Sequence, residues 1–407
     1  MRFPLPIRLL LLGLLLTLTA CGQQGRDPNE VLLWTGFESE LPTLHQLARE
    51  FRVETGISVR TVKVPFSRLR DKYLIAAPAG QGPDLLIGPQ DWVGILTTAG
   101  LLEPLPEAVL PASERVNFLP VTVQALEFEG RLYAVPLVAD CVALIRNPTL
   151  VPHHPDSLDE LVELARAAQA PGVYGFYYEL EDLYFSWPIF AAYGARLFQV
   201  HDGRIDPTAP ALDEPAAVRA ASFLQSLRRE GLIPVGATTD MAKSFYVEGR
   251  AGMILNGPWF LQDLRNAKVA YAIEPIPGTR SHPAAPLVTV QGIMLNNRAV
   301  ARENALRFLS FMARPGPQTR VALASGRPPA HREALAEAGR DATVGPDLQA
   351  FARVIERGTP MPNHPAVSAV WAPMKQALEL ITTGVDPAEQ LHQTRLLVER
   401  KIRQMME

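Results

Sequence analysis

Between residues 31 and 87 the sequence alternates between short apolar runs and segments with helical periodicity. The apolar runs are 31–34 and 85–87, residues 57–64 alternate in the manner of a β-branched strand, and the helical segments between these three are 41–51 and 68–77. Apolar runs of this length are typical of buried strands, and Gly56 is a typical helix stop. A β-α-β-α-β order predicts a parallel sheet with right-handed crossovers, so the expected fold class is α/β.

The remainder of the chain continues this pattern and then becomes helical. We expect a helix over 91–99 that ends at Gly100, a mostly helical stretch from Ser157 to Tyr246, and helices from Arg302 to Met406. Further strands are expected at 132–135, 141–145, 252–255 and 288–295. The sequence therefore predicts an α/β protein with a helical C-terminal part.

Size and charge narrow the function classes. At 407 residues the chain has room for two or three domains. Lys and Arg number 39 against 42 Asp and Glu, a formal net charge of −3. Nonspecific nucleic-acid binders carry a large basic excess, so we expect no nucleic-acid partner.

The first twenty residues are typical of an export signal. Arg2 and Arg8 lead into the apolar run 9–20, which is too short to span a bilayer. Leu18-Thr19-Ala20-Cys21 resembles a bacterial lipobox, in which the cysteine is lipidated and becomes the mature N-terminus. We therefore expect a signal peptide over 1–20, lipidated Cys21 with a tether over 21–29, and an exported protein held at the membrane. The alternative is an ordinary cleavage site that happens to contain a cysteine.

Removal of the signal peptide and lipidation of Cys21 would also change the net charge and the number of free cysteines. Loss of Arg2 and Arg8 lowers the formal net charge from −3 to −5. Cys141 would be the remaining cysteine, so we expect no disulfide and a buried, inert thiol.

Motifs for catalysis and cofactor binding are missing. The sequence contains no Gly-x-Gly-x-x-Gly after a strand, no P-loop, no His-Glu-x-x-His and no Gly-x-Ser-x-Gly. His153 and His154 are flanked by prolines, which favours an exposed loop over a metal site. We expect neither enzymatic activity nor a cofactor or metal. A tethered glycoside hydrolase remains an alternative, since Glu179, Glu181 and Asp182 could contribute to a carboxylate pair.

Aromatic residues are interleaved with carboxylates in a way that suits carbohydrate. Residues 177–187 are dense in both, Trp259 follows a predicted strand, and Trp371 lies in a late predicted helix. Aromatic rings cover the apolar faces of sugars, and carboxylates accept hydrogen bonds from sugar hydroxyls. The alternative is that these rings belong to the core.

Six sequence strings together resemble the sugar-binding subunits of bacterial ABC importers, the maltose/maltodextrin-binding protein group. The resemblance runs in register from about Val31 to the C-terminus. The strings are Gly82-Pro83-Asp84, Gly100-Leu101-Leu102, Gly130–Pro136, Tyr184–Pro188, Asn256–Trp259 and Met361-Pro362-Asn363.

The resemblance implies a two-lobed periplasmic-binding-protein fold with a ligand cleft between discontinuous lobes. The first lobe would comprise 30–138 plus 290–338, and the second 139–289 plus 339–407. Ligand would stabilise the closed form, because only that form contacts it from both sides. The implied partners are an oligosaccharide and the membrane subunits of an ABC permease, with the receptor itself a monomer.

Ligand-binding residues carry over where the strings align. The resemblance implies sugar contacts from carboxylates, from stacking aromatic rings and from two flanking side chains. These residues are Glu38, Asp91, Trp92, Asp140, Asp182, Tyr184, Trp259, Met361 and Trp371. Glu181 could replace Asp182 if the local alignment shifts by one. Trp34 and Trp187 are expected in the core.

Three positions depart from the family pattern. Gly88 stands where the family has an aromatic residue, Trp92 where it has an arginine, and Ala372 where it has a tyrosine. We therefore expect a disaccharide-sized glycoside, maltose or trehalose first, rather than a long maltodextrin. A receptor of the same fold for a polyamine remains an alternative, because cations also bind acids and aromatic rings.

Overall fold

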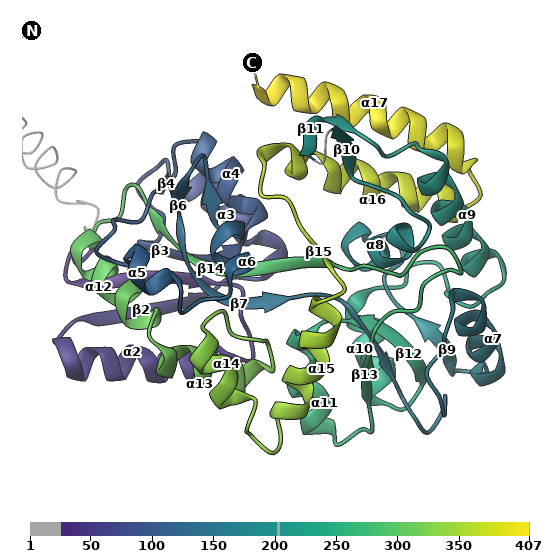
Figure 1. The fold of residues 1–407 in the computed structure, drawn as a ribbon, viewed down its shortest axis with the longest axis horizontal. Coiled ribbons are helices and arrows are strands. Elements are labelled where there is room, and N and C mark those ends of the chain that lie inside the picture. Colours follow the sequence, from purple (N-terminus) through teal and green to yellow (C-terminus); the bar gives the residue numbers. More distant parts are fainter. Residues whose placement is uncertain (1–25, 202–203, 407) are drawn as a thin grey trace, which may run out of the picture.

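The computed structural model describes residues 26–201 and 204–406, so the predicted signal peptide and Cys21 lie outside the described residues. The fold is α/β and two-lobed, with two main sheets that each have their own hydrophobic core (Figure 1). Among the described residues, no helix is both long and apolar enough to cross a bilayer.

The first sheet contains seven strands in the order β15-β14-β3-β1-β2, with β4 and β7 also paired to β14. Its strands are β1 (Glu30–Thr35), β2 (Ser58–Lys63), β3 (Leu85–Pro89), β4 (Leu102–Glu103), β7 (Ala134–Asp140), β14 (Leu287–Asn296) and β15 (Thr359–Pro360). β1 pairs in parallel with β2 and β3, which confirms the predicted β-α-β-α-β unit. β14 runs antiparallel to β3 and β7, an arrangement that local sequence patterns do not reveal.

Helices and one hairpin complete the first half of the chain. They are α2 (Leu41–Thr55), α3 (Phe66–Ala76), α4 (Asp91–Thr98), α5 (Ala112–Arg115), α6 (Pro120–Ala125) and the hairpin β5 (Glu127–Phe128) with β6 (Arg131–Leu132). α2 ends as predicted, since Gly56 adopts the left-handed conformation at φ 76°. Gly100, with φ 67°, likewise follows the end of α4.

The second sheet has the order β13-β8-β12-β9. Its strands are β8 (Ala143–Arg146), β9 (Tyr174–Tyr177), β12 (Ala251–Asn256) and β13 (Ala272–Glu274). The surrounding helices are α7 (Leu158–Ala168), α8 (Leu183–Ala192), α9 (Pro215–Arg229), α10 (Thr239–Val247), the 3₁₀ turn η1 (Pro258–Phe260) and α11 (Leu261–Ala267). The expectation of a mostly helical stretch from Ser157 to Tyr246 needs correction, because β9 and the hairpin β10 (Phe198–His201) with β11 (Arg204–Pro210) interrupt it.

The C-terminal part is helical, as predicted. It comprises α12 (Arg302–Met312), α13 (Pro315–Ser325), α14 (Arg332–Ala338), α15 (Gly345–Ile355), the 3₁₀ turn η2 (Pro365–Val367), α16 (Ser368–Thr382) and α17 (Pro387–Met406). In Figure 1, α16 and α17 lie beside α9 over the right-hand part of the molecule, and α12 and α13 lie over the left-hand part.

The chain crosses between the two cores at the end of β7 and inside β14. Val138 at the end of β7 belongs to the first core, whereas Cys141, three residues later, belongs to the second. β14 crosses in the opposite direction, because Val288 lies in the second core and Val290 in the first. All ten residues of β14 are buried, so the crossing segment is itself part of the core.

One strand boundary was predicted wrongly. A strand was expected to end at Val135, but β7 continues through Pro136 to Asp140. Proline has no N–H to donate to a sheet, which usually argues against continuation. Here the pairing of β7 with β14 shifts between Gln291 and Gly292, opposite Pro136, and the strand continues past the irregularity.

Candidate functional site

A buried ionic cluster lies where β7 leaves the first sheet. Arg327, just after α13, pairs with Asp140 (Nη1 to Oδ2, 3.0 Å) and with Glu40 (Nε to Oε1, 2.9 Å). Gln291 of β14 also donates to Asp140 Oδ2, at 3.1 Å. Burial, opposed by Arg327, raises the pKa of Asp140. Within the described part of the chain, Asp140 Oδ1 accepts no hydrogen bond, so the cluster has an unused acceptor.

Arg327 also joins aromatic rings that belong to different cores. Its guanidinium carbon lies 4.5 Å from the ring centroid of Phe37, in the first core, and 5.8 Å from that of Trp259. Trp259 is half-buried against the second core. Such contacts are favourable cation–π interactions and hold both rings in defined positions.

Trp259 belongs to a small group of aromatic rings. The ring of Tyr184, in α8, lies 6.4 Å from that of Trp259, and the ring of Phe185 lies 6.2 Å away at a steep angle. The Tyr184 hydroxyl lies 3.4 Å from Thr289 Oγ1, on the crossing strand β14. The structure therefore brings together three of the predicted residues: Asp140, Tyr184 and Trp259.

Glycine at position 257 allows the position of Trp259. A Cβ atom added to Gly257 would lie 2.2 Å from the Trp259 ring, which is far inside contact distance. The backbone of Gly257 is extended, so the glycine is needed for space rather than for an unusual φ. The string Asn256-Gly257-Pro258-Trp259 thus folds the indole back over its own turn.

A second group forms around the first turn of α4. Asp91 begins α4, two residues after the end of β3, and burial raises its pKa to about 6, while Arg70 and the Trp371 side chain act in the opposite direction. Trp371 is half-buried and lies on α16, so this group also combines elements from both halves of the chain. Asp91 Oδ1 has no hydrogen-bond partner among residues 26–201 and 204–406.

Trp92 occupies the space next to Gly88. A Cβ atom on Gly88 would lie 2.6 Å from the Trp92 ring. Trp92 is only 5% exposed and stacks on Phe66 at a centroid distance of 5.5 Å. The differences from the family pattern at positions 88 and 92 are therefore linked, because the ring of Trp92 fills the volume beside Gly88.

The acidic segment 179–182 has structural partners. Glu181 pairs with Arg228 and accepts from Thr382 at 3.3 Å. Glu179 accepts from Thr239 and Lys375, and these bonds hold its pKa below the ordinary value despite burial. Asp182 caps α8 by accepting from the backbone N–H of Tyr184 at 2.8 Å, while burial and Glu179 raise its pKa. Glu181, the alternative to Asp182 as a ligand contact, is therefore already paired with the guanidinium of Arg228.

The remaining predicted site residues are Glu38 and Met361. Glu38 is exposed and pairs with Lys63 at the end of β2. Met361 is buried, and its backbone bonds to Val288 at 3.0 Å and to the Gln90 side chain at 3.0 Å. Trp34 and Trp187 are buried in the first and second cores, as predicted.

Sequence reasoning missed the residues that connect the predicted ones. Arg327, Glu40, Phe37 and Gln291 were not proposed, although Arg327 lies in the cluster with Asp140 and against Trp259. Arg327 sits in Gly-Arg-Pro-Pro, a loop string without periodicity. No local sequence pattern marks it, because its pairing with Asp140 and Glu40 exists only in the folded chain.

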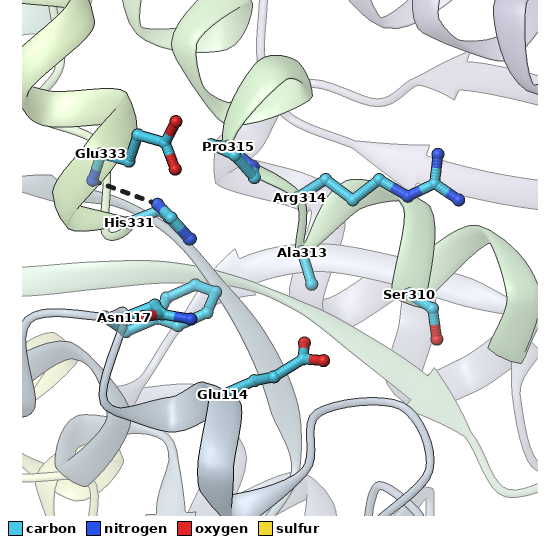
Figure 2. Close-up of a pocket in the computed structure, with 9 residues that line it drawn as sticks. Glu114, Asn117, Ser310, Ala313, Arg314, Pro315, His331 and Glu333 are labelled. Carbon is cyan, nitrogen blue, oxygen red and sulfur yellow. Dashed lines mark hydrogen bonds between the residues drawn. The ribbon is translucent and has the colours of Figure 1, made fainter.

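Two cavities lie elsewhere. One, of about 220 Å³, is lined by Glu114, Asn117, Phe118, Ser310, Ala313, Arg314, Pro315, His331 and Glu333. In it the side chains of Glu114 and Ala313 point toward one another, while Arg314 extends away (Figure 2). The other, of about 380 Å³, lies between His154 and Arg357. Neither includes a predicted ligand-binding residue.

The adjacent histidines His153 and His154 each lie beside a glutamate. His153 is exposed and lies 3.4 Å from Glu160, and His154 lies 3.2 Å from Glu274. Across residues 26–201 and 204–406, no group of three or more His, Cys, Asp or Glu side chains could hold a metal ion. Cys141 is fully buried, as expected, and burial raises its pKa well above the ordinary value.

Comparisons with known proteins agree with this architecture. The family model described as "Bacterial extracellular solute-binding protein" matches residues 46–348. The maltotriose-binding protein of Pyrococcus abyssi is 28% identical over 370 residues, covering 87% of this chain and 77% of that protein. A maltooligosaccharide ABC transporter solute-binding lipoprotein of Streptococcus pneumoniae is 23% identical, covering 92% and 91%. The structure of the Thermus thermophilus maltotriose binding protein bound with maltotriose matches with a TM-score of 0.84 at 32% identity, covering 91% and 100%.

Proposed function

Because the chain belongs to the bacterial extracellular solute-binding protein family, we propose that it is a sugar receptor that delivers an oligosaccharide to an ABC importer. The observation that carries this proposal is the contact of Arg327 with Asp140 and Trp259. It places a carboxylate with an unused acceptor beside an aromatic ring, the combination that binds the hydroxyls and the apolar face of a sugar.

We propose that the lobes divide at 138/139, 289/290 and 338/339 and close on the ligand. The change of core membership between Val138 and Cys141, and between Val288 and Val290, supports the first two limits. Tyr184 and Trp259 would bring the second lobe to the ligand, and Asp91 with Glu38 the first. A ligand that touches both lobes stabilises the closed form.

We also propose that the protein is exported and held to the membrane by lipid on Cys21. The lipobox-like Leu18-Thr19-Ala20-Cys21 supports this, as does the description of the Streptococcus relative as a lipoprotein. We propose no catalytic role, since Glu179 and Glu181, the acids considered for hydrolysis, are engaged by Lys375 and Arg228.

The proposed ligand is a disaccharide-sized glycoside. Trp92 fills the volume beside Gly88 and stacks on Phe66, so it offers no exposed ring face there for an additional sugar unit. Ala372 likewise offers no ring next to Trp371.

Calorimetric titration tests the proposed ligand directly. The panel comprises maltose, trehalose, maltotriose and maltoheptaose, with spermidine as a non-sugar. We expect one site per chain and the tightest binding for a disaccharide. Tightest binding of maltoheptaose would contradict the ligand size, and binding of spermidine without any sugar would overturn the sugar receptor itself.

Replacement of the central ring tests the site. Trp259→Ala removes the stacking surface, and we expect sugar binding to weaken by about 2 kcal/mol or more, roughly 30-fold. Tyr193→Ala is a matched control, because Tyr193 packs on Phe223 outside this group. Unchanged affinity of a folded Trp259→Ala variant would place this ring outside the site.

A further inference from the structure

Asp84 is a fully buried carboxylate that organises one end of the first sheet. It accepts from the backbone N–H groups of Leu32 at 2.7 Å, Val300 at 2.7 Å and Ala301 at 3.1 Å. Its charged partner is Arg26, which also donates to the carbonyl of Gly82 at 2.8 Å. Arg26 is thereby fixed to the body of the protein four residues before β1 begins.

The contact of Arg26 with Asp84 shortens the length of free chain between the predicted lipid anchor at Cys21 and the body of the protein. Cys21 precedes Arg26 by five residues and Glu30 by nine. At about 3.4 Å per residue, the extended chain spans at most about 17 Å from Cys21 to Arg26, but about 31 Å from Cys21 to Glu30. The pairing of Arg26 with Asp84 therefore determines how far the body can move from the membrane.

The surface beside this pair suits a lipid surface. We call Ile75, Pro78, Arg298 and Val300 the basal rim. Ile75 is 76% exposed and Val300 is 43% exposed, which is unusual for large apolar side chains. Arg298 donates to the carbonyl of Pro78, and Val300 is bonded to Asp84, so the rim adjoins Arg26. Apolar side chains beside an arginine match the acyl and anionic headgroup regions of a bilayer.

We propose that Arg26 and Asp84 form a latch that keeps the basal rim against the membrane surface. This inference rests on the proposed lipid anchor at Cys21. The basal rim lies at the amino ends of β1 and β3, whereas Asp91 follows the carboxyl end of β3. The latched receptor therefore presents its binding site at the end of the sheet farther from the anchor.

Energy transfer to labelled lipid tests the latch in the full-length lipidated protein. The vesicles contain phosphatidylethanolamine and phosphatidylglycerol with an acceptor dye on the headgroup. A donor dye is attached at Val300→Cys on the rim or at Val235→Cys, an exposed loop position of the second half. Buried Cys141 does not compete for the label. We expect stronger transfer from position 300 than from position 235.

Loss of the latch should remove this difference. Arg26→Gln should lower transfer from position 300 toward the value at 235, while Arg60→Gln, which breaks the exposed pair of Arg60 with Glu30, should leave it unchanged. Equal transfer from both positions, or no effect of Arg26→Gln, overturns the latch. Mass spectrometry that finds no lipid on Cys21 overturns both the anchor and the latch. Sugar titration of the same samples separates these results from a failure of the receptor function.

Discussion

Arg327 is the residue on which the candidate site depends most. It is 6% exposed, lies between Glu40 and Asp140, and contacts Phe37 and Trp259. Its removal would leave two buried carboxylates without their cation, which usually costs far more than an exposed ion pair is worth.

The first prediction concerns this arginine. Arg327→Met should lower the free energy of unfolding by about 3–5 kcal/mol, because Glu40 and Asp140 would be buried without a counter-ion. Urea unfolding measures the loss. Arg320→Met, which breaks the exposed contact of Arg320 with Glu50, is the control and should change stability by less than about 1 kcal/mol. Equal effects of the two variants would show that the cluster is not the stabilising element inferred here.

The second prediction concerns pH and Asp91. The pKa of Asp91 is raised from 3.8 to about 6 by burial, so its ionisation disfavours the folded state. This destabilisation is absent below pH 3.8, grows as the pH rises to about 6, and is complete above it. Asp91→Asn should therefore stabilise the protein at pH 8 by about 3 kcal/mol and gain little at pH 4.

The same change should weaken sugar binding, because a neutral amide is a poorer acceptor than a carboxylate. Denaturant unfolding at both pH values and calorimetric titration at pH 8 provide the two measurements. A variant that is not stabilised at pH 8 would contradict the burial of the ionised form.

Sequence reasoning predicted the aromatic and acidic residues of the candidate site but not the residues that contact and link them. Tyr184, Trp259 and Asp140 were proposed from aligned strings, and the structure places them together. Arg327 and Glu40 were missed because they become neighbours only after folding, from positions almost 290 residues apart. Trp92 could not be placed from sequence, since its packing depends on the absence of a side chain at Gly88.

Elements meet at Gln90, which joins the start of α4 to β14 and to the segment that follows β15. Its side-chain amide donates to Val288 at 3.2 Å and to Met361 at 3.0 Å, and its oxygen accepts from the N–H of Val290. Gln90 is fully buried, so no water can replace these bonds. The residue that follows it is Asp91, so β14 is tied to the candidate site through Gln90.

The third prediction follows from this arrangement. Gln90→Leu has a similar volume but removes the side-chain partners of the Val290 N–H and the Met361 carbonyl, whereas the Val288 carbonyl keeps its bond from the N–H of Met361. Each buried unsatisfied group costs about 1–3 kcal/mol, so we expect a loss of several kcal/mol in unfolding free energy. Gln262→Leu is the control, since Gln262 bonds to Asn266 in an exposed position of α11. Comparable stability of the two variants would contradict the role of Gln90.

The strengths and failures of the element predictions have a common cause. The first three strands and helices were predicted well because their apolar spacing is regular. β9 and the β10–β11 hairpin were missed because they are short or half-exposed, so their residues do not alternate clearly between buried and exposed. The insertion of β14 between β3 and β7 is a long-range pairing, and local periodicity contains no information about it.

The whole molecule should respond to ligand as one closing unit. Ligand that binds only the native protein raises its stability, by about 2.7 kcal/mol at a concentration 100 times the Kd. A ligand that touches both lobes raises the stability of both.

The fourth prediction is therefore a change in size together with a change in stability. On addition of the sugar that binds most tightly, we expect a smaller radius of gyration by X-ray scattering and a higher Tm. Trp259→Ala should abolish both changes, whereas Tyr193→Ala should preserve them. A higher Tm without any compaction would indicate binding without closure.

The position of β14 also determines when the protein can finish folding. β14 pairs with both β3 and β7, yet it begins about 200 residues after β3 ends. The first sheet therefore lacks β14 until residue 296 has been synthesised and its edge strand β15 until residue 360, and contacts between such distant residues form slowly. For the exported protein proposed above, this delay would leave the leading half without a finished domain while the chain is still being synthesised.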